Sequence, residues 1–274
     1  MRKVYGLVGH PTVGLITPHL HQAAIRSKDL ETEYRLFDVD PNDEEALANF
    51  CYETDLNYLA GFGVTHPHKK SVMDYLDYFD PLAKIVGAAN TVLNERSQLI
   101  GHNTEAMGAM NALREATDII GKKALVLGAG IAARAIAYGL REFQADVFVF
   151  NRTFEKVEQM TKEFKVEAID YDKIPEEEFD IIVNATPVGS KLYPNETLLT
   201  SDQIHPSAVV MDLSIEPLST RLIAEAQKAG AKTVTGERML LHSTADQFRL
   251  FFNAEPPLEA MEQALYSALE QRGS

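Results

Sequence analysis

Cysteine and positive charge are scarce in this sequence of 274 residues. The single cysteine, Cys51, excludes a disulfide within the chain and a cysteine-rich metal site. With 26 lysines and arginines against 40 aspartates and glutamates, the formal net charge of −14 disfavours nucleic-acid binding, which requires a basic surface. An anionic small-molecule substrate stays compatible with this charge, because a pocket can be locally cationic.

Long hydrophobic runs, internal repeats and low-complexity stretches are absent as well. No segment approaches the ~18 apolar residues of a membrane span. The apolar stretch over residues 4–9 is too short for a signal peptide. We therefore expect a soluble, cytoplasmic protein with no membrane partner. Hydrophobic residues make up 45% of the chain, which suffices for one large core or two moderate ones.

The pattern of the first hundred residues is typical of a separate α/β unit. It predicts strands over 4–8, 34–39 and 59–65, helices over 19–27, 43–51 and 69–77, and a hairpin-like pair of strands over 86–93 and 99–102.

From residue 104 onward, strands and helices alternate. The pattern predicts a helix over 104–117, strands over 123–127, 146–150, 180–184, 208–212 and 233–235, a helix over 218–229, and two final helices between 239 and 269, separated by Pro256-Pro257. Such alternation implies a parallel, doubly wound sheet.

We predict an α/β protein with two domains. Residues 1–103 would form the N-terminal substrate domain, with the helices from about 240 to 274 packing back on it, and residues 104–239 a Rossmann-type nucleotide-binding domain. The ligand cleft is expected where the carboxyl ends of the second domain's strands face the first domain.

A glycine-rich turn follows the predicted strand 123–127. Gly128 allows a tight turn, Gly130 lets the backbone approach a pyrophosphate, and Ala133 keeps the following helix close to the sheet. This G-x-G-x-x-A turn lies between a strand and an Ala-rich helix, with a second strand about 20 residues on, which is the context of a dinucleotide site. The alternative is a turn that needs small residues only for packing.

The end of the next strand indicates which dinucleotide is bound. Asn151-Arg152-Thr153 and Lys156 stand where an NAD site usually carries an acidic residue. A carboxylate would repel a 2′-phosphate, whereas the Arg152 guanidinium can bind one through paired hydrogen bonds. NADP is therefore favoured over NAD, the alternative being a solvated surface arginine.

Polar residues follow several strands of the first unit: Thr65 with Lys69, Asn90 with Thr91, and the segment 103–105, which ends at Glu105. A lysine beside an acid could transfer the proton that accompanies hydride transfer to a ketone. On spacing alone, a surface lysine among capping residues is an equal alternative.

Motif order resembles that of the shikimate dehydrogenase family along nearly the whole chain. The motifs that carry the resemblance are GLVGHP at 6–11, GFGVTHPHK at 61–69, GAANT at 87–91, GHNTE at 101–105, GAGIAA at 128–133, NRT at 151–153, NATPVG at 184–189 and GERML at 236–240. The resemblance implies reduction of 3-dehydroshikimate to shikimate with NADPH by two α/β domains around a deep cleft.

The resemblance also implies roles for individual residues. Lys69 and Glu105 fall on the catalytic pair, and Thr17, Thr65 and Asn90 fall on substrate-binding positions. Cofactor binding is implied for Gly128, Ala129, Gly130, Ile131, Ala132, Asn151, Arg152, Thr153, Lys156, Thr186, Gly236 and Met239.

Five positions depart from the family pattern. Glu105 replaces an aspartate, Leu15 a serine, Ile215 a tyrosine, Ser243 a glutamine and Gly63 an asparagine. Leu15, Ile215 and Ser243 remain substrate-binding positions, but groups that usually bind the substrate carboxylate and ring hydroxyls are lost. We therefore expect a substrate related to shikimate or quinate, and poor binding of shikimate itself.

Several questions stay open on sequence alone. The histidine pairs His19/His21 and His66/His68 suggest a metal, but we expect none, since His21 and His68 match family positions without metal. His66, His102 or Arg238 could supply donors to the altered pocket or could be ordinary surface residues. The alternative function is a non-catalytic nucleotide-binding sensor. A monomer and a homodimer are both compatible with the sequence.

Overall fold

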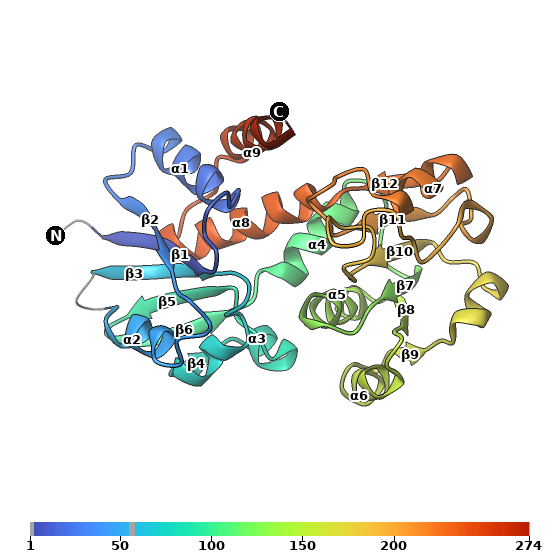
Figure 1. Ribbon diagram of the computed structural model, residues 1–274, viewed down its shortest axis with the longest axis horizontal. Coiled ribbons are helices and arrows are strands. Elements are labelled where there is room, and N and C mark those ends of the chain that lie inside the picture. Colours follow the sequence, from blue (N-terminus) through green and yellow to red (C-terminus); the bar gives the residue numbers. More distant parts are fainter. Residues whose placement is uncertain (1–2, 55–57, 274) are drawn as a thin grey trace. The chain divides into compact units, whose positions relative to one another are not determined.

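The computed structural model describes residues 3–54 and 58–273 and divides into two compact units (Figure 1). The first unit comprises Met1–Thr104 and Ser243–Ser274, and the second comprises Glu105–His242. Among the described residues, no helix is both long and apolar enough to cross a membrane.

The first unit is built on a mixed sheet of six strands in the order β2-β1-β3-β5-β6-β4. Their bounds are β1 (Val4–Gly9), β2 (Glu33–Asp38), β3 (Leu59–Val64), β4 (Tyr78–Phe79), β5 (Thr91–Glu95) and β6 (Gln98–His102). β1 pairs in parallel with β2 and β3, whereas β5 runs antiparallel to both β3 and β6. The predicted hairpin is confirmed: Arg96 and Ser97 connect β5 to β6 with φ of 55° and 63°, as a type I′ turn requires.

The helical elements of the first unit are α1 (Thr17–Ser27), α2 (Ala46–Tyr52), the 3₁₀ helix η1 (Ser71–Tyr75), α3 (Pro81–Val86) and α9 (Leu258–Gly273). The helix expected over 69–77 is wrong in kind, because only a short 3₁₀ segment forms there. The strand expected over 86–93 starts five residues late, since α3 ends at Val86.

The sequence carries signals for α3. The Asp80 Oδ1 accepts a hydrogen bond of 2.5 Å from the Ala83 N–H and caps the helix, Pro81 is its first residue, and Gly87 ends it with φ of 75°. An acceptor before a proline and a glycine after the last turn are the usual marks of a helix, here over only six residues.

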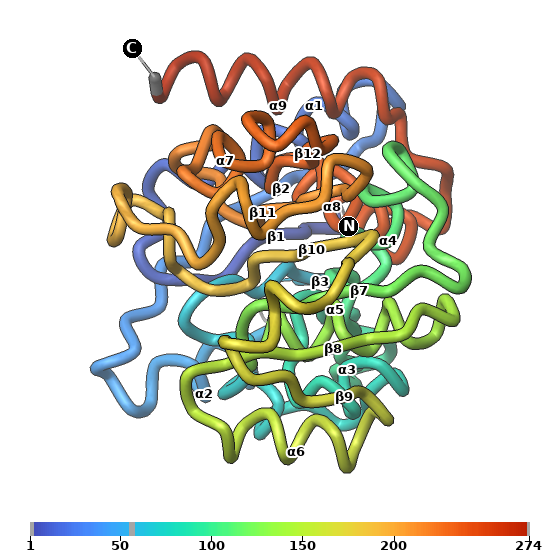
Figure 2. The backbone as a smooth tube through the Cα atoms, turned by 90° about the vertical axis from the view of Figure 1, so that its right-hand side faces the viewer, coloured from blue at the N-terminus to red at the C-terminus, as the bar shows by residue number. Residues whose placement is uncertain are grey.

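The second unit contains a six-stranded sheet in the order β12-β11-β10-β7-β8-β9, with every neighbouring pair parallel. Its strands are β7 (Lys123–Leu127), β8 (Asp146–Phe150), β9 (Glu167–Ala168), β10 (Ile181–Asn184), β11 (Val209–Asp212) and β12 (Lys232–Val234). Figure 2 shows them one above another from β9 to β12. This order confirms the predicted Rossmann-type, doubly wound sheet.

α4 (Glu105–Arg114) precedes β7, and the connections between the strands contain α5 (Ile131–Glu142), α6 (Phe154–Phe164), the 3₁₀ turns η2 (Tyr171–Glu176) and η3 (Ser201–Gln203), and α7 (Arg221–Ala229). The four residues Ala124–Leu127 of β7 and all of β10 are buried. A parallel sheet covered on both faces buries every residue of its central strands, which is why they read as continuous apolar runs.

The last two helices are α8 (Gly236–Phe252) and α9. They are separated by Pro256-Pro257, as predicted, although α8 begins three residues before the expected start at 239. The C-terminal part of α8 belongs to the first unit, where α9 packs on α1.

Candidate nucleotide and substrate sites

Gly128 begins the turn after β7 in a conformation that favours glycine. Its φ is +118°, and its N–H donates a 2.7 Å hydrogen bond to the Phe150 carbonyl at the end of β8. A Cβ at this position would lie 3.0 Å from the carbonyl oxygen of Ala185. Residue 128 must therefore be small for the ends of three strands to approach each other.

Gly130 immediately precedes α5, whose first residues are Ile131 and Ala132. A Cβ on Gly130 would meet no atom within 4 Å, so open space lies in front of the helix. The first N–H groups of a helix have no partners within it, and together with the helix dipole they attract anions. This open helix start can therefore bind a phosphate.

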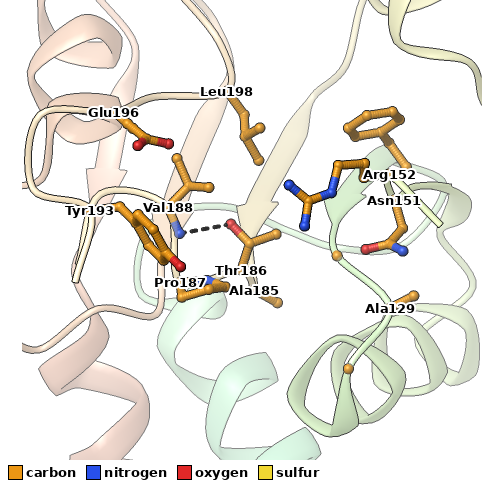
Figure 3. Close-up of a pocket in the computed structure, with 13 residues that line it drawn as sticks. Ala129, Asn151, Arg152, Ala185, Thr186, Pro187, Val188, Tyr193, Glu196 and Leu198 are labelled. Atoms are coloured by element: carbon orange, nitrogen blue, oxygen red, sulfur yellow. Dashed lines mark hydrogen bonds between the residues drawn. The ribbon is translucent and has the colours of Figure 1, made fainter. Parts of the chain in front are cut away.

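A cavity of about 330 Å³ lies at the carboxyl ends of β7, β8 and β10 (Figure 3). Six predicted cofactor residues line it: Gly128, Ala129, Gly130, Asn151, Arg152 and Thr186. The other lining residues are Phe150, Ala185, Pro187, Val188, Tyr193, Glu196 and Leu198. The other predicted cofactor residues do not line it: Ile131, Ala132, Thr153, Lys156, Gly236 and Met239.

Arg152 is exposed, and in Figure 3 its guanidinium extends across the cavity toward Thr186. The neighbouring Asn151 is fixed by a 3.0 Å hydrogen bond from its Nδ2 to the carbonyl of Thr153, the residue before α6. Lys156 is exposed in the first turn of α6. The cavity is therefore cationic at the end of β8, and its acidic residue, Glu196, lies on the opposite side in Figure 3.

Asn184 and Asp212 organise the loops after β10 and β11. They face each other across the two strands, and the Asn184 Nδ2 donates to the Asp212 Oδ2 at 3.0 Å. The Asn184 Oδ1 accepts hydrogen bonds from the Thr186 N–H at 3.1 Å and hydroxyl at 2.7 Å, which fixes Thr186 beside the cavity. Sequence reasoning gave neither Asn184 nor Asp212 a role, although each is the last residue of its strand.

Asp212 is 1% exposed and supports both loops. Its carboxylate accepts hydrogen bonds from the Thr220 hydroxyl at 2.8 Å and from the Ser214 N–H at 3.0 Å. Burial raises the pKa of Asp212 above its usual value, although these hydrogen bonds and that of Asn184 favour the charged form.

Neither Gly236 nor Met239 lines the cavity, and Gly236 lies against the loop after β11. A Cβ on Gly236 would lie 2.5 Å from the carbonyl oxygens of both Leu213 and Ser214, so only glycine allows this contact. The same loop carries Ile215, which is half-buried, and Met239 is buried in α8.

Arg238, whose role the sequence left open, is engaged by Glu115. The Arg238 Nη2 and Nε donate to the two Glu115 carboxylate oxygens at 2.6 and 2.8 Å, and the His242 ring contacts Oε1 at 2.7 Å. Burial opposes ionisation of Glu115, but these hydrogen bonds outweigh it and hold the pKa of Glu115 below its usual value. Arg238 therefore forms an ion pair with Glu115, and this geometry does not favour a role in binding a substrate anion.

In the first unit, the main chain brings Thr65, Lys69 and Asn90 together. The Thr65 N–H donates to Val8 of β1 at 2.9 Å, the Val64 N–H donates to the Asn90 carbonyl at 2.8 Å, and the Lys69 carbonyl accepts from Ala89 at 2.9 Å. Three residues predicted to act on one substrate therefore meet at the carboxyl end of β3. Glu105, the other predicted catalytic residue, is buried at the start of α4 in the second unit.

The Asn90 side chain is 4% exposed and held by its neighbours. Its Oδ1 accepts from the Thr104 N–H at 2.8 Å and the Thr91 hydroxyl at 3.1 Å, and its Nδ2 donates to the Thr104 hydroxyl at 2.8 Å. The Thr104 hydroxyl in turn donates to the Ser243 carbonyl at 3.0 Å. Ser243 thus joins this cluster through its main chain.

The segment that carries Leu15 and Thr17 leaves β1 beside Thr65. A Cβ on Gly9, the last residue of β1, would lie 2.3 Å from the Thr65 Cγ2. Asp38 anchors the segment by accepting from Thr12 and contacting His10 at 2.7 Å. Leu15 and Thr17 are both half-buried.

The remaining histidines have distinct surroundings. His68 is buried and contacts the Val39 carbonyl at 2.7 Å, His102 contacts Asp80 at 3.1 Å, and His66 is exposed. Over residues 3–54 and 58–273, no three or more His, Cys, Asp or Glu side chains form a group that could hold a metal ion.

Comparison with known proteins identifies similar chains over nearly the full length. Residues 7–92 match the model of the shikimate dehydrogenase substrate binding domain, and residues 110–227 match that of shikimate/quinate 5-dehydrogenase. The NADP(+) shikimate dehydrogenase of Methanopyrus kandleri is 39% identical over 97% of this chain and 96% of its own length.

Solved structures agree with the sequence matches. A shikimate dehydrogenase in complex with NADP+ superimposes with a TM-score of 0.89 at 37% identity, covering 98% of this chain and 96% of the other. The Thermus thermophilus enzyme, in complex with NADP(H) and shikimate, has a TM-score of 0.89 at 34% identity over 97% of this chain and 99% of its own.

Proposed function

The chain belongs to the shikimate dehydrogenase family, and we propose that it is an NADP-dependent oxidoreductase that interconverts 3-dehydroshikimate and shikimate, or a related ring ketone and alcohol. The observation that carries this proposal is the meeting of Thr65, Lys69 and Asn90 at one edge of the first unit's sheet, in a chain whose second unit holds a dinucleotide cavity. The non-catalytic sensor is not favoured, because the relatives matched over nearly the whole chain are dehydrogenases.

We assign cofactor binding to residues 104–239 and substrate binding to residues 1–103 with the C-terminal helices. The start of α5 would hold the pyrophosphate, and Arg152 with Lys156 the 2′-phosphate. Thr186, fixed by Asn184, would border the nicotinamide. When bound, NADPH supplies the hydride equivalent that reduces the ring ketone.

The proton that accompanies this reduction is assigned to Lys69. Its ammonium would donate to the forming alkoxide oxygen and, in the oxidative direction, its amine would accept the hydroxyl proton. Glu105 is assigned as the acid of the catalytic pair that the resemblance implies. Thr65, Asn90 and Thr17 would hold the ring through hydrogen bonds, which places the reacting carbon without taking part in proton transfer.

The proposal is tested by following NADP+ reduction with shikimate, quinate and other cyclic hydroxy acids. We expect oxidation of at least one of them, with NADP+ preferred to NAD+. Lys69→Ala should lower turnover by roughly 10²–10⁴-fold, the usual contribution of a general acid–base group. The dissociation constant of NADP+ should stay unchanged, since Lys69 and the cavity belong to different units.

Two outcomes would count against this assignment. A parent protein that oxidises none of the compounds is not the proposed enzyme. A Lys69→Ala variant with most of its turnover would show that another group carries the proton. Glu105→Asp, which restores the family's shorter acid, should retain part of the activity.

A further inference from the structure

Gln247 is a buried polar residue of α8 that the proposed chemistry does not use. Its side chain is 5% exposed and lies within the first unit. The Nε2 donates a 2.9 Å hydrogen bond to the main-chain carbonyl of Asn90, and the Oε1 lies 3.1 Å from the His21 Nε2. The amide thus connects α1 with the segment that carries a substrate-site residue.

The orientation of this amide is determined by its partners. A carbonyl oxygen can only accept, so the NH₂ group of Gln247 must face Asn90 and the Oε1 must face His21. His21 then has to donate from Nε2. Burial lowers the pKa of His21 to about 4, so the ring is neutral at pH 7 and carries its single proton at that nitrogen. The ring also stacks on Tyr34 with centroids 4.5 Å apart, which prevents it from rotating freely.

Gln247 completes the set of hydrogen bonds that hold the Asn90 peptide. The Asn90 carbonyl also accepts from the Val64 N–H at 2.8 Å, and the Asn90 N–H donates to the His102 carbonyl at 3.0 Å. The peptide groups on both sides of Asn90 are thereby held, one by β6 and the other by the end of β3 and α8. The Asn90 Nδ2 carries two hydrogens and donates one to the Thr104 hydroxyl, so the direction of the second follows from the placement of both the Asn90 main chain and Thr104.

Gly63 of β3 provides the space into which the amide fits. A Cβ on Gly63 would lie 3.5 Å from both the Nε2 and the Oε1 of Gln247, and 3.0 Å from the Leu7 Cδ1. The Gly63 backbone does not require glycine, because its φ lies outside the left-handed region. A Cβ alone would therefore press on Leu7 and reach ordinary van der Waals contact with the Gln247 amide, so any side chain longer than alanine that extends in this direction would enter the space of that amide.

We propose that Gln247 is a positioning residue for the substrate site: it holds the Asn90 peptide so that the second Nδ2 hydrogen of Asn90 points to a ring hydroxyl of the substrate. This proposal rests on the proposed function, in which Asn90 binds substrate. The geometry further implies that a short amide side chain at position 63 could replace that of Gln247, because both would occupy the same space.

A double-mutant cycle tests the proposal with Gln247→Ala, Gly63→Asn and the combined variant. Gln247→Ala should raise the KM for the ring substrate about tenfold, the equivalent of one buried hydrogen bond, and leave kcat within about threefold. Gly63→Asn alone should also raise KM, since two amides compete for one space. The combined variant should return KM to within about threefold of the parent. Phe248→Leu, at a fully buried position on the same helix, is the matched control and should lower the Tm without changing KM.

The outcomes separate this proposal from the proposed function. A Gln247→Ala variant with a lowered Tm and an unchanged KM would assign Gln247 a purely structural role and overturn the proposal. If the KM increases of the two single variants multiply in the combined variant, the two side chains do not share one space, and that part of the proposal is wrong. If the parent oxidises none of the ring compounds, the proposed function fails. The Tm values of the parent, the two single variants and the combined variant then still test whether the two amides share one space: recovery of Tm in the combined variant supports it, and additive losses of Tm refute it.

Discussion

Of the two cations that we assign to the 2′-phosphate, Arg152 and Lys156, only Arg152 lines the cavity. It is exposed, lies at the rim of the cavity after β8 and has no acidic residue beside it at positions 151 and 153. We predict that Arg152→Asp weakens NADP+ binding by at least about tenfold, because it removes a charge-assisted pair and adds repulsion of the 2′-phosphate. NAD+ binding should be unchanged or stronger. Fluorescence titration of both cofactors measures this, and equal affinity of the parent for NAD+ and NADP+ would refute the role of Arg152.

His21 makes stability depend on pH. Its folded-state pKa of about 4 lies below the ordinary 6.5, so between these values the unfolded chain binds a proton that the folded protein does not. The contribution of neutral His21 to the free energy of unfolding is therefore fully present above pH 6.5 and should fall by up to about 1.4 kcal/mol per pH unit as the pH drops toward 4. His21→Gln keeps a donor for Gln247 but does not titrate. Urea unfolding at several pH values should show a shallower decline for this variant, and equal slopes would contradict the prediction.

At the scale of elements, the contact between Asn184 and Asp212 joins the ends of β10 and β11. Asp212→Leu would leave the Asn184 amide, the Thr220 hydroxyl and the Ser214 N–H without their acceptor. We predict a loss of about 2–4 kcal/mol in the free energy of unfolding and weaker NADP+ binding, since Thr186 depends on Asn184. Asp212→Asn retains one acceptor oxygen and should cost less. Equal stability of both variants in urea unfolding would show that contacts other than those of Asp212 hold the loops after β10 and β11.

The elements also show where local sequence signals are sufficient. The central parallel strands follow from continuous apolar runs, and the β5–β6 hairpin was expected from two strand-like segments that lie close together in the sequence. The helix expected over 69–77 and the strand expected to start at residue 86 were wrong, because a 3₁₀ segment and a six-residue helix have too few residues to establish an apolar period. The two-residue strands β4 and β9 depend on a neighbouring strand for their existence.

At the scale of the whole molecule, one prediction about substrate preference combines a residue from each unit. Leu15 lies in the first unit and Ile215 in the second, and the resemblance to the family implies hydroxyl groups for the substrate carboxylate at both positions. A carboxylate without such donors is costly to bury, so we predict a high KM for shikimate. Leu15→Ser combined with Ile215→Tyr should lower that KM roughly five- to 150-fold, the equivalent of about 1–3 kcal/mol for hydrogen bonds to a charged group.

Steady-state kinetics of parent and double variant measure this preference. Each single variant serves as a control, because one hydroxyl should recover only part of the affinity. A parent with a low KM and fast turnover of shikimate would show that other donors, such as Thr17, already bind the carboxylate.

The sequence by itself determined the α/β class, the parallel sheet with its glycine turn, and the residues at strand ends that the proposed chemistry uses. These features are local, because apolar period, glycine spacing and turn residues act within a few positions of each other. Only the tertiary structure placed Asp212 beside Asn184 across 28 residues, Gln247 beside Asn90 across 157, and Glu115 beside Arg238 across 123. Such hydrogen bonds depend on strand register and on which face a helix presents to the sheet, and both are decided when the whole core packs.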